Sequence, residues 1–252
     1  MPAGSSGPVW AASCWRPPGS RAYSCSRSFS ICSPRWRWRL RLGRTIPARD
    51  SLSLGRTVRA GFAAARASRR LLGALWLTVH FNLFGWPVLS LVPVIARDRL
   101  GLGVEATGIL ASMDGMGALV GAIVLAPFAR PGRYGRIYVG GIVLFMCMMP
   151  LAALATHPVL AGGALALVGA GQSAFAVMQA TICYLAAPAK LRAQALGMLS
   201  MCIGFGPIGF VVVGALAGRI GATPTAVLAG ISGLAVLALT RRWWSQTWRD
   251  AD

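Results

Sequence analysis

The sequence predicts an all-α membrane protein with six transmembrane helices and both termini in the cytoplasm. Hydrophobic residues make up 56% of the 252 residues and charged residues only 12%, whereas a soluble domain carries about 25% charged residues. Each of six successive apolar stretches is close to the ~20 residues that cross ~30 Å of hydrocarbon. In lipid, the backbone N–H and C=O groups can be paired only within helices or closed barrels. The six stretches lack the strict alternation of barrel strands, which leaves helices. The six apolar stretches are residues 71–96, 107–128, 136–156, 159–187, 195–218 and 223–240.

Residues 1–50 are predicted to form a disordered basic leader. Residues 1–70 hold fourteen arginines against one acid, Asp50. The first 43 residues are rich in Ser, Arg, Pro and Trp and lack the apolar core of about 7–15 residues that a signal peptide needs. The run RWRWRLRLGR could bind RNA or anionic lipid, but a nucleic-acid partner is not expected, since that role would rest on the leader alone. An upstream frameshift would leave a similar biased stretch, so a non-native leader is a further interpretation.

Residues 51–70 are predicted to form an amphipathic linker helix on the cytoplasmic surface. Apolar residues recur there at helical spacing, with arginines on the other side. These apolar residues are Leu54, Val58, Phe62 and Ala65.

The loops predict the orientation of the transmembrane domain, residues 71–240. Nearly all the cations that flank the spans fall in four segments: just before the first span, in ARPGRYGR (129–136), in APAKLRAQ (187–194) and in the tail, residues 241–252. The positive-inside rule places these segments in the cytoplasm, which predicts a multi-pass protein of the cell (inner) membrane with the lipid bilayer as its first partner. Three tail tryptophans fit an interfacial belt, namely Trp243, Trp244 and Trp248.

Three segments carry a resemblance to a known family: the linker with the first span (51–103), the loop LAPFARPGRYGRIYVGG (125–141), and APAKLRAQALGMLSMCIGFGPIGFVVVGALAGRIG (187–221). Together they resemble the second six-helix half of a major facilitator superfamily transporter. The branch they are most similar to contains enterobactin-type siderophore exporters and drug efflux permeases.

Individual residues match or depart from the motifs of that family. The 125–141 loop resembles a cytoplasmic G-x-x-x-D-R-x-G-R-R motif, but its acidic residue is missing, since Ala129 and Arg130 stand at the candidate positions. The 187–221 segment resembles an A-P-x-x-x-R-x-R motif, with Gln194 in place of the second arginine. The matching residues are Gly132, Arg133, Gly135, Arg136, Pro188 and Arg192.

The resemblance implies transport of a small organic molecule, by proton-coupled efflux, with no cofactor. Family members have about twelve helices and work by rocking one half against the other. We therefore expect a second six-helix half, from a homodimer or a separate chain. The alternative is a truncated, non-transporting fragment or an assembly partner of a complete permease. No enzyme is expected, because the sequence lacks HExxH, GxSxG, paired intramembrane aspartates and a P-loop lysine, and no Cys/His cluster has metal-ligand spacing.

Polar residues within the spans are the candidate substrate or proton-coupling residues. Asp114 is the only charged residue that interrupts an apolar span, and burying its charge costs on the order of 2.5–3.5 kcal/mol. It could carry a proton or pair with a cationic substrate, or it could be a protonated carboxyl bonded to a neighbouring helix. His80 and Asn82 point in roughly opposite directions, while Gln172 and Gln179 share one face. For these four, structural hydrogen bonds are the alternative.

Glycines and prolines in the spans predict close packing or bending, with gating as the alternative. Gly117 and Gly121, like Gly214 and Gly218, have the four-residue spacing that lets helices approach. Bends are predicted in the first span at Pro87 and Pro93 and in the fifth at Gly204, Gly206, Pro207 and Gly209. In the cytoplasmic loops, Arg133, Arg136 and Arg192 could hold a gate or simply anchor the protein at the membrane surface.

Overall fold

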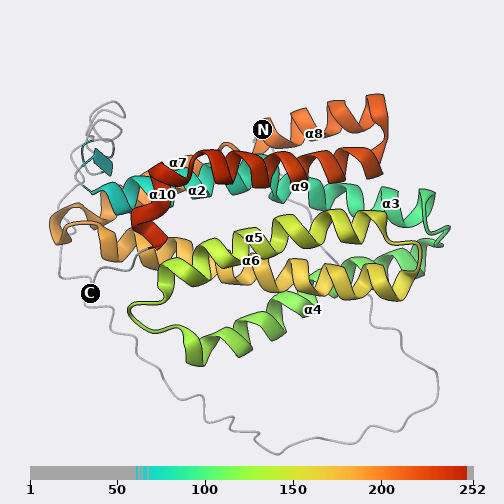
Figure 1. Cartoon of the computed structure of the whole chain (residues 1–252), viewed down its shortest axis with the longest axis horizontal. Coiled ribbons are helices and arrows are strands. Elements are labelled where there is room, and N and C mark those ends of the chain that lie inside the picture. The colour runs from blue at the N-terminus through green and yellow to red at the C-terminus, as the bar shows by residue number, and fades with distance from the viewer. Residues whose placement is uncertain (1–60, 62, 64, 67, 249–252) are drawn as a thin grey trace, which may run out of the picture. The chain divides into compact units, whose positions relative to one another are not determined.

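The computed structural model describes residues 61, 63, 65, 66 and 68–248 (Figure 1). Contacts divide the chain into residues 1–48 and 49–252, and every described residue belongs to the second unit. The predicted leader and most of the predicted linker helix, including Leu54, Val58 and Phe62, lie outside the described residues. Ala65 is helical and buried, and Arg66 is helical and exposed.

Six segments of the described chain are long and apolar enough to cross a membrane, which confirms the predicted all-α fold. They are Arg69–Asp98, Val104–Phe128, Tyr134–Leu154, Pro158–Ala186, Ala189–Ile220 and Ala222–Leu239. The helices that build them are α2 (Arg69–Phe84), η1 (Trp86–Leu91), α3 (Val92–Asp98), α4 (Val104–Leu125), η2 (Ala126–Phe128), α5 (Tyr134–Leu154), α6 (Pro158–Ala186), η3 (Ala189–Leu191), α7 (Arg192–Ile203), α8 (Gly206–Ile220) and α9 (Ala222–Leu239).

The first and fifth spans are both interrupted, and the two interruptions meet. Pro87 has no N–H to continue α2, so that helix ends at Phe84 and the chain passes through the 3-10 turn η1 into α3. The fifth span breaks between α7 and α8, where Pro207 stands in the first turn of α8. A Cβ at Gly209 of α8 would lie 2.6 Å from Pro87 Cγ and 2.8 Å from the Asn82 carbonyl oxygen. The glycine thus lets α8 pack on the end of α2.

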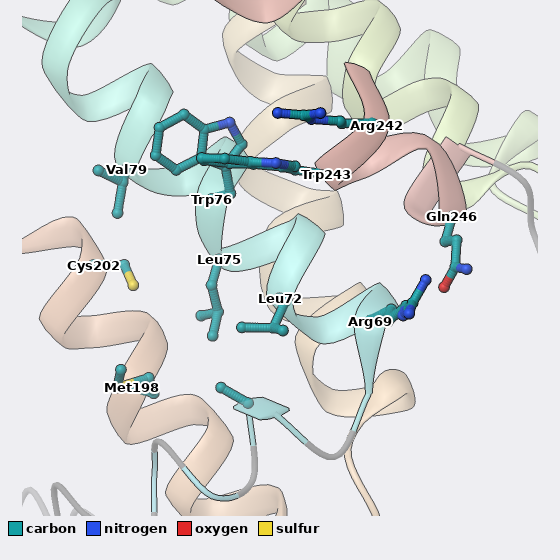
Figure 2. A pocket seen from close by; sticks show the side chains of 11 residues that line it. Arg69, Leu72, Leu75, Trp76, Val79, Met198, Cys202, Arg242, Trp243 and Gln246 are labelled. Carbon is teal, nitrogen blue, oxygen red and sulfur yellow. The ribbon is translucent and has the colours of Figure 1, made fainter. Parts of the chain in front are cut away.

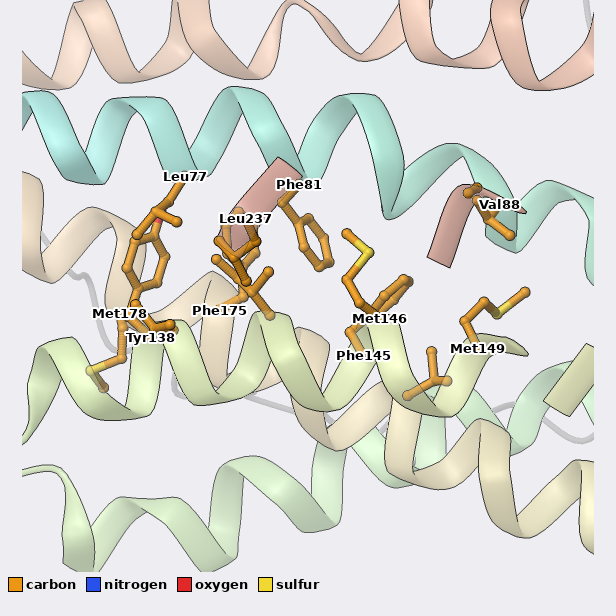
Figure 3. Packing of buried hydrophobic residues seen from close by; sticks show 14 of the residues in the cluster. Leu77, Phe81, Val88, Tyr138, Phe145, Met146, Met149, Phe175, Met178 and Leu237 are labelled. Carbon is orange, nitrogen blue, oxygen red and sulfur yellow. The ribbon is translucent and has the colours of Figure 1, made fainter. Parts of the chain in front are cut away.

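Helix α6 lies between α4 and α5 and packs along both (Figure 1). Aromatic rings fill the space that α6 shares with α2 and α5 (Figure 3). Phe81 of α2 stacks on Phe175 of α6 at a centroid distance of 4.0 Å, and Tyr138 of α5 stacks on the same ring at 5.3 Å. The Tyr138 hydroxyl is fully buried, donates to the Ala74 carbonyl at 3.0 Å, and lies 2.9 Å from Thr78 Oγ1. The buried hydroxyl pair is therefore satisfied.

The segment after the last span folds back as a further helix, α10 (Arg241–Trp248). Thr247 is fully buried and donates to the Arg70 carbonyl at 3.1 Å, so this segment and the start of the first span lie at one end of the bundle. Trp244 is also buried, and its indole N–H donates to the Leu237 carbonyl at 2.9 Å. Trp244 therefore packs on the C-terminal end of α9, while Trp243 and Trp248 are exposed, and the interfacial belt stays a prediction for all three.

Candidate functional site

Asp114 lies at one of the close contacts between α4 and α6. A Cβ at Gly169 of α6 would overlap the Asp114 carbonyl oxygen and would lie 2.8 Å from the Ala118 nitrogen. The Asp114 side chain is half-buried, and its Oδ1 is buried without a hydrogen-bond partner among the described residues. A carboxyl held in this way can bind a proton or accept a hydrogen bond from a ligand.

Gln172 and Gln179 stand three and ten residues after Gly169 in the sequence of α6, and both are half-buried. Each has a buried Oε1 without a hydrogen-bond partner in the described part of the chain. Buried polar atoms are paired in most proteins, so two unpaired acceptors are unusual. Because both atoms are buried, a substrate, water or a second polypeptide reaches them only after the surrounding side chains move. Gln172 stands one turn beyond Gly169 on α6, and Gly169 contacts the Asp114 backbone.

His80 and Asn82 belong to different interfaces and do not join this group. His80 is buried, and its ring lies 5.2 Å from that of Phe84, one turn on along α2. A Cβ at Gly233 of α9 would lie 3.3 Å from Phe84 Cβ, so Phe84 faces α9. His80, four residues earlier, lies on the same face of α2 and therefore also on the α9 side. Asn82 is buried at the contact with α8, 3.7 Å from a Cβ at Gly206, and donates to the Thr78 carbonyl at 2.8 Å.

The residues of the 125–141 loop have separate structural environments. Gly132 has a φ of +88°, a conformation that favours glycine, and Arg133 and Arg136 are exposed without ion pairs among the described residues. Gly135 is buried under α10, because a Cβ there would overlap the Thr247 carbonyl oxygen.

Arg192 is engaged at the turn between α6 and α7. It donates from Nη1 to the Tyr184 hydroxyl at 3.1 Å, and its guanidinium carbon lies 4.3 Å from the centre of that ring.

The two predicted glycine pairs behave differently. A Cβ at Gly117 would overlap the Ala166 carbonyl oxygen of α6, and one at Gly121 would lie 2.7 Å from Ala170 Cα. At Gly214 and Gly218, a Cβ would meet nothing within 4 Å in the described chain. Among the described residues no helix makes the predicted close approach to this second pair, because α8 packs through Gly209 on another part of its surface.

Sequence reasoning missed several glycines that bring helices together, among them Gly169, Gly73 and Gly230. Gly169 of α6 packs directly on the backbone of α4, and a Cβ at Gly73 would overlap the Thr247 hydroxyl of α10. A Cβ at Gly230 of α9 would overlap the Pro150 ring of α5. The run of small residues along α6, at 162, 166, 169, 170 and 173, was the signal that could have identified the α4 interface.

Comparison with known proteins places these observations in a family. The model of a family described as Major Facilitator Superfamily matches residues 29–210, more than half of the chain. No curated protein and no solved structure matches the chain.

Proposed function

The chain belongs to the major facilitator superfamily, and we propose that it is one six-helix half of a permease that exports a small organic molecule across the cell membrane in exchange for protons. The family and the six spans together make the chain a multi-pass membrane protein of the transporter type. Its resemblance to enterobactin-type exporters and drug efflux permeases supports outward movement and an organic substrate.

The observation that carries proton coupling is the position of Asp114. It is the one acid that interrupts the apolar spans. Its backbone carbonyl lies at the contact of α4 with α6, and its buried Oδ1 has no hydrogen-bond partner among the described residues. Ionisable groups inside a membrane commonly form proton relays or ion sites. Gln172, close by on α6, supplies a hydrogen-bond acceptor for the organic molecule.

The exposed glycines of α8 support a second six-helix half. Membrane helices associate through small residues that let their backbones approach, and Gly214 and Gly218 are exposed with open space around them. Only 17% of the apolar window of the second span and 28% of that of the fifth are buried, against 50% or more in the first, third and fourth. We propose that a second copy, or a separate chain, packs on this α8 surface.

Proteoliposomes test the transport proposal. The purified chain is reconstituted with a trapped pH-sensitive dye, an acid-inside gradient is imposed, and ethidium and other small organic cations are added outside. We expect substrate-dependent alkalinisation of the interior, loss of this signal in Asp114→Asn, and retention in the matched control Asp98→Asn. Asp98 is exposed and paired with Arg97 at 3.2 Å.

The same assay decides between one chain and two. Flux that appears only after co-reconstitution with a second six-helix chain would identify a hetero-oligomeric permease. The proposal would be wrong if no flux appeared under any of three conditions: the chain alone, a cross-linked dimer, or the chain with such a partner. The chain would then be a non-transporting subunit.

A further inference from the structure

A groove of about 500 Å³ opens between α2, α7 and α10 (Figure 2). It lies at the end of the bundle where the first span begins and the last span ends, because Trp76 of α2 donates to Thr240 Oγ1 at 3.1 Å. This is the end predicted to face the cytoplasm. The groove does not include Asp114, Gln172 or Gln179.

One wall of the groove is apolar and follows two helices. Leu72, Leu75 and Val79 recur along one face of α2, and Met198 and Cys202 lie one turn apart on the facing side of α7 (Figure 2). Val79 and Cys202 lie further from the start of their spans, and therefore deeper in the predicted membrane, than Leu72 and Met198. The wall thus forms a continuous apolar track from the membrane boundary inward.

The other side of the groove is cationic. Arg69 stands at the start of α2, and Arg242 and Gln246 project from α10 (Figure 2). Both arginines are exposed, no carboxylate lines the groove, and neither arginine has an ion-pair partner in the described part of the chain. Trp76 and Trp243 lie beside Arg242, and their rings meet edge to face at 5.0 Å (Figure 2). Amphipathic rings at this depth are typical of the interface between headgroups and acyl chains.

We propose that this groove binds one anionic phospholipid, with its phosphate headgroup on the Arg69, Arg242 and Gln246 side and an acyl chain along Leu75, Val79 and Cys202. Basic pockets between membrane helices on the cytoplasmic side bind anionic headgroups, and guanidinium groups form strong charge-assisted hydrogen bonds to phosphate. A zwitterionic lipid would bring its own cation to a site that already holds two. The inference does not depend on what the chain transports.

Native mass spectrometry of the full chain in detergent, with equal amounts of phosphatidylglycerol and phosphatidylcholine, tests the proposal. An arginine near an anionic headgroup contributes about fivefold in affinity, so the double variant Arg69→Gln/Arg242→Gln should lose roughly 25-fold in preference for phosphatidylglycerol. The matched control, Arg133→Gln/Arg136→Gln, removes two exposed cytoplasmic charges outside the groove and should keep the preference. Met198→Trp fills the apolar track and should reduce the binding of both lipids.

Two further variants keep the test decisive. Arg69→Lys/Arg242→Lys retains the charge and should retain most of the preference. If the double glutamine variant does not fold, Arg69→Gln alone should lose about fivefold. Equal binding of the two lipids by the unmodified chain would mean an ordinary lipid-facing surface and would overturn the proposal. Equal losses in the groove variant and the control, or no lipid bound at all because another segment or molecule fills the groove, would also overturn it.

Discussion

Replacing Gly135 by alanine tests whether α10 is held on the bundle by close backbone contact. The new methyl carbon would overlap the Thr247 carbonyl oxygen and lie 2.8 Å from the carbonyl carbon and 3.2 Å from Trp248 Cα. Ordinary contact begins at 3.4 Å, and backbone atoms cannot rotate away as a side chain can. Helix α10 must therefore retreat from the start of α5.

The retreat strains the hydrogen bonds that dock α10. Thr247 donates to the Arg70 carbonyl and Trp244 to the Leu237 carbonyl, and each such bond contributes about 1 kcal/mol net. Overpacking of this kind costs about 1–3 kcal/mol. At about 2 kcal/mol, the undocked fraction of α10 rises about 30-fold.

Limited trypsin digestion of the full chain in detergent measures this fraction, because cleavage within a folded helix follows the population of its open form. Cleavage after Arg241 and Arg242 should be about 30-fold faster in Gly135→Ala than in the unmodified protein. Gly140→Ala is the matched control, since Gly140 is exposed on the same helix and no described atom lies within 4 Å of a Cβ there. Equal cleavage rates in the two variants would refute the proposed docking contact.

Three further substitutions probe the bundle. Gly117→Ala should push α4 from α6 and cost about 1–3 kcal/mol of stability, which is measured as a lower thermal midpoint of the detergent-solubilised chain. Gly108→Ala is the control on the same helix, in open space among the described residues, and should leave the midpoint unchanged or slightly raised. Tyr138→Phe should cost about 1 kcal/mol in chemical denaturation while the helical circular dichroism is retained, since Thr78 still donates to the Ala74 carbonyl; a cost near zero would show that the hydroxyl bond is not needed. His80→Phe should keep the ring contact with Phe84 and leave the pH profile of transport unchanged, because His80 faces α9. The midpoint should stay the same or rise, since both buried ring nitrogens lack a hydrogen-bond partner among the described residues. A shifted pH profile would instead assign His80 to proton coupling.

The number and position of the spans could be predicted from the sequence because hydropathy is a local property of the chain. A stretch of about 20 apolar residues must form a helix in lipid whatever surrounds it. The prolines and glycines of the first and fifth spans marked their interruptions for the same reason, since Pro87 and Pro207 break the helix through their own covalent structure.

Which surface of each span packs against a neighbour was decided only by the tertiary structure. Lipid tails are as apolar as leucine, so the packed and lipid-facing sides of a membrane helix do not differ in hydrophobicity as they do in water. The pairs Gly117/Gly121 and Gly214/Gly218 have the same spacing in the sequence, yet in the described part of the chain only the first is covered by another helix. Likewise, the sequence determined that Trp244 follows the last span, but its burial depends on Leu237 and on the glycines that admit α10, which come together only when the bundle forms.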